Sequence, residues 1–159
     1  MSASTAALPR VLPGVCDRAR SGVQWPAMPP LVTAGAMISC SMATPPVTVP
    51  LATTPKATPV NAGAPAGSIE DYVPLTNIPS FGMCGAPSNP AVAAATAAKM
   101  GAFTPAPCSP AVSTPWTPGA GKVKVDGAPA LHQGCQATCA WGGVITISSP
   151  GNEGKVQVS

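Results

Sequence analysis

Apolar and polar residues alternate along this chain in short runs that Pro and Gly separate, a pattern typical of β-strands joined by turns. We expect strands over residues 37–42, 47–51, 122–125, 144–148 and 155–158. The run Val-Ile-Thr-Ile-Ser at 144–148 carries the strongest strand signal, because β-branched residues dominate it. The pattern therefore predicts a small, mainly β protein with long Pro/Gly-rich loops.

One segment has a different character and predicts a single short α-helix at about residues 90–100. It is rich in Ala, the residue with the highest helix propensity. Ser88 or Asn89 can cap its start, and Pro90 falls where a first-turn proline is tolerated. Gly101 is a natural stop.

The chain is expected to hold one domain, over residues 31–159, behind an N-terminal extension. Residues 1–30 lack alternation and end in several prolines, so we expect them to be flexible. The string Gly-Ala-Pro-Ala occurs at 63–66 and again at 127–130, which suggests two related strand-turn units. The start has no Sec-type signal pattern, so we expect the cysteines to be made in a reducing cytoplasm.

The composition leaves few large side chains to stabilise a core. The chain has 22 Pro and 16 Gly in 159 residues; 45% of residues are hydrophobic, 8% charged and 4% aromatic. Low charge and high hydrophobicity argue against disorder. A core of Ala and Val with Trp116 and Trp141 as its large members needs a staple, such as disulfides, a metal or oligomerisation. The only basic cluster, Arg10, Arg18 and Arg20, has no interleaved aromatic residues, so nucleic-acid binding is not indicated.

The cysteines are the candidates for that staple. Five of the six lie in the expected domain: Cys40, Cys84, Cys108, Cys135 and Cys139. No Cys-x-x-Cys pair occurs, so spacing alone leaves a metal site, free thiols and disulfides all open. A reducing compartment favours metal or free thiols.

Catalytic alternatives are weaker. His132 with Cys135 as nucleophile, or the adjacent carboxylates Glu70 and Asp71, could support catalysis. A structural His and a solvated carboxylate loop are the better interpretations. No phosphate loop, nucleophile elbow or dinucleotide fingerprint is present, so we predict no catalytic residue and no enzyme activity.

Four short motifs occur in a fixed order: Ile38-Ser-Cys-Ser-Met42, Phe81-Gly-Met-Cys84, Pro107-Cys108 and Cys139-Ala-Trp-Gly-Gly143. In this order they resemble the PAAR-like spike-tip family of contractile injection systems, over roughly residues 31–148. Two features depart from that family, since the Pro-Ala-Ala-Arg motif is absent and only one His is present.

The resemblance implies a small conical β domain that caps a trimeric VgrG-like β-helical spike protein and pierces a target membrane. It implies a structural zinc ion held by Cys40, Cys84, Cys108 and Cys139, with Cys135 or His132 as alternative ligands. Export as part of the injection particle, with or without attached cargo, is implied too. The remaining alternatives are a small effector or enzyme delivered by such a system, and a disulfide-rich secreted binding module.

Overall fold

The fold consists of short antiparallel β-strands and one helix. The computed structural model describes residues 28–55 and 64–151, together with Val156 and Val158. The elements are β1 (Met37–Cys40), β2 (Thr48–Pro50), β3 (Met83–Cys84), α1 (Pro90–Ala98), β4 (Ala106–Pro107), β5 (Lys124–Val125), β6 (Ala128–Pro129), β7 (Gln136–Thr138) and β8 (Val144–Ser149). The prediction of a mainly β protein with one short helix is confirmed.

Four strands form the central sheet, in the order β2-β1-β8-β7. Alternation sets its two faces: Ile38 is fully buried and pairs with Ile147 across β8. On the opposite face the Ser39 and Thr146 hydroxyls hydrogen-bond at 3.2 Å. The strong strand pattern at 144–148 therefore lies at the centre of the sheet, because β8 pairs on both sides.

Helix α1 begins where its capping residue predicts and ends at Ala98, two residues before the predicted end. The Asn89 side chain accepts the Ala91 N–H at 3.0 Å, so Asn89 rather than Ser88 is the cap. Pro90 occupies the first turn. Only Val92 in the helix is buried, so most of α1 faces solvent.

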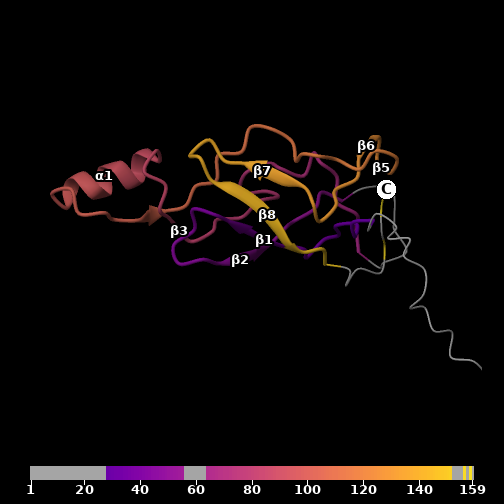
Figure 1. The fold of residues 1–159 in the computed structure, drawn as a ribbon, viewed down its shortest axis with the longest axis horizontal. Helices are drawn as coiled ribbons and strands as arrows, with labels where there is room; N and C mark the ends of the chain where they lie inside the picture. Colours follow the sequence, from indigo (N-terminus) through magenta and orange to yellow (C-terminus); the bar gives the residue numbers. More distant parts are fainter. Residues whose placement is uncertain (1–27, 56–63, 152–155, 157, 159) are drawn as a thin grey trace, which may run out of the picture.

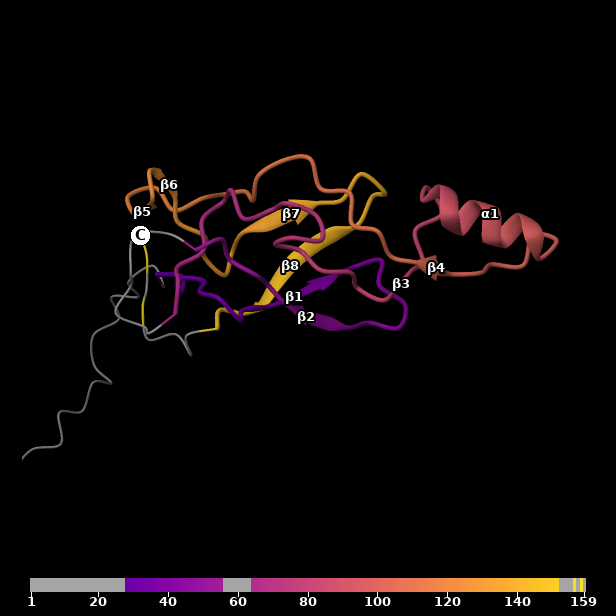
Figure 2. The same ribbon diagram turned by 180° about the vertical axis from the view of Figure 1, so that it is seen from behind.

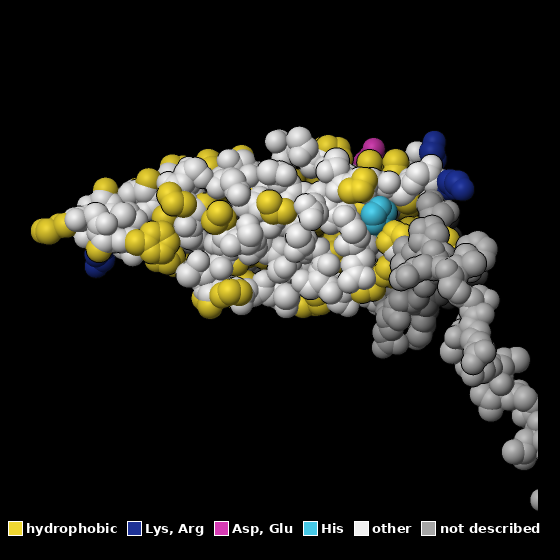
Figure 3. Space-filling model, viewed as in Figure 1, with side chains coloured by type: hydrophobic (Ala, Val, Ile, Leu, Met, Phe, Trp, Pro, Cys, Tyr) yellow, Lys and Arg dark blue, Asp and Glu magenta, His cyan; other side chains and the backbone are white. Residues whose placement is uncertain are grey.

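The molecule is elongated and tapers towards α1. Figures 1 and 2 place α1 at one end and the β5–β6 hairpin at the other, with the central sheet between them. The space-filling view shows the same taper (Figure 3). Among the described residues, no helix is both long and apolar enough to cross a bilayer.

Three segments of equal length close a ring at the end opposite α1, near β6 (Figure 1). They are residues 30–36, 65–71 and 129–135, and each begins with Pro. The second residue of each segment bridges the fourth residue of a neighbour, in the pairs Leu31–His132, Ala66–Thr33 and Ala130–Ser68.

The hydrogen bonds of this three-segment ring follow a cyclic order. At the third position each N–H donates to the third carbonyl of one neighbouring segment, and at the fifth position each N–H donates to the first carbonyl of the other neighbouring segment. The six bonds are Val32 to Leu131, Leu131 to Gly67, Gly67 to Val32, Gln133 to Pro30, Ile69 to Pro129 and Ala34 to Pro65. They span 2.8 to 3.1 Å. One chain thus builds a pseudo-three-fold arrangement from segments distant in sequence.

Two sequence predictions fall largely outside the described residues. Of the strand expected at 155–158, only Val156 and Val158 are described. The Val158 N–H donates to the Pro29 carbonyl at 3.0 Å, and the Leu31 N–H donates to the Val156 carbonyl at 2.8 Å. The expected extension, residues 1–30, lies outside the described residues except for 28–30.

The prediction that Glu70 and Asp71 lie in a solvated loop is wrong for Asp71, whose side chain is 1% exposed. Its carboxylate accepts the Ser68 N–H at 2.8 Å and the Thr54 N–H at 3.1 Å. Its backbone carbonyl accepts the indole N–H of Trp116 at 2.9 Å. A buried carboxylate is tolerated here because hydrogen bonds replace its lost hydration.

Candidate metal centre

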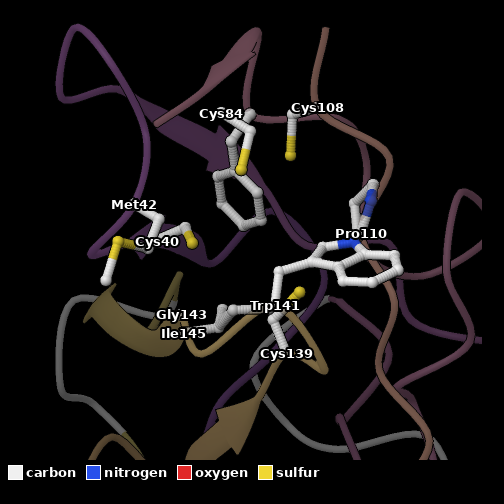
Figure 4. Close-up of a pocket in the computed structure, with 10 residues that line it drawn as sticks. Cys40, Met42, Cys84, Cys108, Pro110, Cys139, Trp141, Gly143 and Ile145 are labelled. Carbon is white, nitrogen blue, oxygen red and sulfur yellow. The ribbon is translucent and has the colours of Figure 1, made fainter. Parts of the chain in front are cut away.

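A pocket between the central sheet and α1 is lined by four of the five described cysteines. Figure 4 shows the sulfur atoms of these four side chains directed towards one space. Met42, Phe81, Pro110, Trp141, Gly143 and Ile145 complete the lining. The sulfurs come from four different places in the chain: Cys40 at the end of β1, Cys84 in β3, Cys108 after β4 and Cys139 after β7.

The four cysteines fall into two structural pairs. Cys40 and Cys139 belong to the central sheet, since Cys40 pairs with Ile145 of β8 and the Cys139 N–H donates to the Gly143 carbonyl at 2.8 Å. Cys84 and Cys108 stand at the two ends of the projection that carries α1. The Cys108 N–H donates to Gly82 at 2.8 Å, which holds these two ends together.

Small residues keep the pocket open. A Cβ added at Gly143 would lie 3.0 Å from the Cys40 sulfur and 3.4 Å from Cγ of Met42. Gly142 has φ of +82°, a conformation that favours Gly. The Gly-Gly pair after Cys139 thus turns the chain sharply while leaving room beside the sulfur.

The two tryptophans behave differently. Trp116 is fully buried, which confirms it as a large core member. Trp141 is half-buried on the pocket rim, where it packs against the small buried cluster of Cys84, Ala86, Val92 and Ala106. Its indole N–H donates to the Ser109 carbonyl at 3.2 Å, and its own carbonyl accepts the Ser88 hydroxyl at 2.6 Å.

Burial and mutual proximity govern the protonation of the thiols. Burial raises the pKa of Cys40 and of Cys108, and the neighbouring cysteine sulfurs raise both pKa values further. Backbone hydrogen bonds from Met42 to Cys40 and from Phe81 to Cys108 lower the pKa and oppose that effect. The Ala86 N–H also points at the Cys84 sulfur, at 3.4 Å. Three of the four sulfurs therefore face backbone N–H donors, which is the environment that metal-bound thiolates use.

The donor set suits zinc, although the sulfurs are not yet at ligand distances. Within residues 28–55 and 64–151, no three His, Cys, Asp or Glu side chains form a group that could hold a metal ion as they stand. Four thiols from four separate segments nevertheless match the all-cysteine structural zinc site in ligand type and number. Binding would require the loops to draw the sulfurs together and the thiols to lose their protons.

The two alternative ligands lie elsewhere. Cys135 and His132 do not line the pocket; both belong to the three-segment ring. The Cys135 thiol is buried and donates to the Pro118 carbonyl. Nδ1 of His132 accepts the Gly134 N–H at 3.1 Å. The five cysteines in the described part of the chain are all free.

Fold and site together define a small antiparallel β protein with a four-cysteine pocket below a helical projection. The chain belongs to the DUF4280 family, described as a domain of unknown function, which it matches over residues 32–152. This range includes all four pocket cysteines. No curated protein and no solved structure matches the chain.

Proposed function

We propose that this protein is a non-catalytic, PAAR-like spike tip of a contractile injection system, stapled by one structural zinc ion. The observation that carries the proposal is the convergence of Cys40, Cys84, Cys108 and Cys139 on one pocket. The order of these cysteines in the sequence led to the same family resemblance independently of the fold.

The zinc site would act as a mechanical cross-link. Cys84 and Cys108 would anchor the two ends of the projection, and Cys40 and Cys139 would anchor the central sheet. Metal ligation adds stability where a core of small side chains supplies little. A tip that stays folded under load needs such a link between its projection and its body.

The three-segment ring supports a three-fold partner. A single chain on a trimeric spike faces a symmetry mismatch, because it presents one surface to three equivalent ones. The cyclic hydrogen bonds among residues 30–36, 65–71 and 129–135 repeat one backbone arrangement three times at the broad end. That end suits docking on a trimeric VgrG-like β-helical spike, and the tapered end would lead. In this scheme the tip assembles in the bacterial cytoplasm, leaves with the particle and contacts the target membrane only on piercing.

The zinc staple is tested by counting metal and thiols in the purified full chain. Stoichiometric zinc, with all six thiols reactive under denaturing conditions once chelator is added, is the expected result. Disulfides without metal would exclude the staple and favour the disulfide-rich module. The partner is tested separately, by co-purification of the chain with a trimeric β-helical spike protein and by visualisation of the complex. Failure to bind such spikes would exclude the spike-tip role.

A further inference from the structure

The projection that carries α1 has the composition of a buried helix but is mostly exposed. Between Cys84 and Cys108 the only charged residue is Lys99. Within α1 only Val92 is buried, and most alanines face solvent. A helix that is apolar all round normally lies inside a protein core or a membrane. We define residues 85–107 as the apolar arm.

Met100 gives the second observation. It has φ of +55°, a left-handed conformation in which Gly or Asn is the usual residue. It is also 95% exposed, so it makes almost no contact within the fold. Phe103, in the same turn, is 59% exposed. The left-handed backbone at Met100 ends α1, but the chain places a large apolar side chain there, in solvent and with almost no contact within the fold.

Part of the backbone of the arm is hydrogen-bonded within the arm itself. Asn89 caps the start of α1. At its other end Met100 and Gly101 donate to the carbonyls of Ala97 and Thr96, at 3.1 and 2.9 Å, and Thr104 N–H donates to the Thr96 hydroxyl at 3.1 Å. Hydrocarbon tolerates backbone only when its polar groups are satisfied internally.

We infer that the apolar arm inserts into the lipid bilayer of the target, with Met100 and Phe103 as its leading side chains. The arm is a convex projection at the tapered end, where Figure 3 shows a hydrophobic side chain at the extreme tip. Its nine-residue helix is about 14 Å long, roughly half of the hydrocarbon core, so it reaches into one leaflet without spanning. Lys99 lies beside Met100 at this leading end, so its ammonium can meet anionic headgroups as Met100 and Phe103 enter the bilayer. This inference rests on the proposed spike-tip function and names the surface that first meets the membrane.

The test is flotation of the full zinc-loaded chain with vesicles of phosphatidylethanolamine and phosphatidylglycerol. Met100→Asn keeps a residue that tolerates the left-handed conformation and removes the apolar side chain. We expect it to preserve or raise the melting temperature and to weaken vesicle binding roughly tenfold, the change that follows when burial of one Met is lost.

Leu75 offers a matched control. It also has positive φ, of 63°, and is 68% exposed. Its turn is tied to the end of β2, where the Ala52 N–H donates to Asn77, and not to the arm. Leu75→Asn should leave vesicle binding unchanged.

Equal loss in both variants, or no vesicle binding by the wild type, would overturn the inference. So would a concentration-dependent dimer that Met100→Asn dissolves while vesicles stay unbound, since a second copy would then cover the arm. Spike co-purification measured on the same preparations separates the two proposals. A chain that binds the spike but not vesicles fails only as a lipid-inserting tip, and one that binds vesicles but no spike fails as a spike tip.

Discussion

Removal of one pocket cysteine should abolish most of the stabilisation by zinc, whereas removal of Cys135 should not. Free zinc at a thousand times its dissociation constant stabilises the bound state by about 4 kcal/mol. Unfolding entropy is about 2.1 cal/mol/K per residue, or about 0.25 kcal/mol/K for the roughly 120 residues that the structure describes. Chelator should therefore lower the melting temperature of the wild type by about 16 °C.

In Cys84→Ser the drop in melting temperature caused by chelator should shrink to about 6 °C or less. A loss of at least 100-fold in zinc affinity leaves only about 1.4 kcal/mol of stabilisation by zinc. Cys135→Ser is the matched control, since Cys135 is equally free and buried but does not line the pocket. It disturbs the hydrogen bond to Pro118. We expect a melting temperature a few degrees lower with and without chelator, and an undiminished difference between the two conditions.

Calorimetry with and without chelator, together with metal analysis of each variant, gives the comparison. The reasoning is refuted if chelator leaves the wild-type melting temperature unchanged. It is refuted equally if Cys135→Ser loses its zinc while Cys84→Ser keeps it, because the ligands would then lie in the ring and not in the pocket.

Three further predictions concern His132 in the ring, the lysines beside the ring, and the arm. Burial lowers the pKa of His132, so the unfolded chain binds this proton at higher pH and stability falls as pH drops through about 6.5. His132→Asn, which can still accept the Gly134 N–H, should reduce that fall in urea denaturation; parallel curves would contradict it. The free energy of unfolding should change by well under about 1.4 kcal/mol per pH unit, because the His132 side chain is only partly buried. Charge reversal at Lys122 and Lys124, beside the ring, should weaken spike binding in pull-downs, whereas Lys99→Glu on the arm should not. In hydrogen exchange, chelator should expose β3, β4 and α1 before β1 and β8; the reverse order would exclude the staple.

The parts of the fold that local pattern determines could be predicted from the sequence. Strand β8 and helix α1 follow from alternation and from capping residues that act within a few positions. Strands β3, β4 and β7 could not be predicted, because each has two or three residues and exists only through pairing with a distant partner. No local signal encodes such pairing.

The candidate site, too, could be predicted only in the parts that local sequence determines. The four cysteines could be selected by motif order, but their convergence depends on β1, β7 and β8 meeting in one sheet. The role of Gly143 was missed, although the Gly-Gly pair after Cys139 signalled a close approach. The repeated Gly-Ala-Pro-Ala string marked two members of the ring. Its third member, residues 30–36, has only the Pro of this string, because the ring is built from backbone bonds that many side chains permit.

The location of the pocket follows from where the fold is weakest. At the broad end six backbone bonds close the ring, and the buried side chains include Leu31 and Leu131. At the other end β3 and β4, of two residues each, pair with each other, a pairing that is marginal alone, and β3 pairs with the body through an isolated bridge between Ala43 and Cys84. The cluster beneath the arm contains Val92 and small residues such as Ala86 and Ala106, so it buries little apolar area. Force applied to the arm would therefore separate this junction first. Cys84 and Cys108 lie on either side of it, so the proposed metal cross-link would add resistance here that packing does not supply.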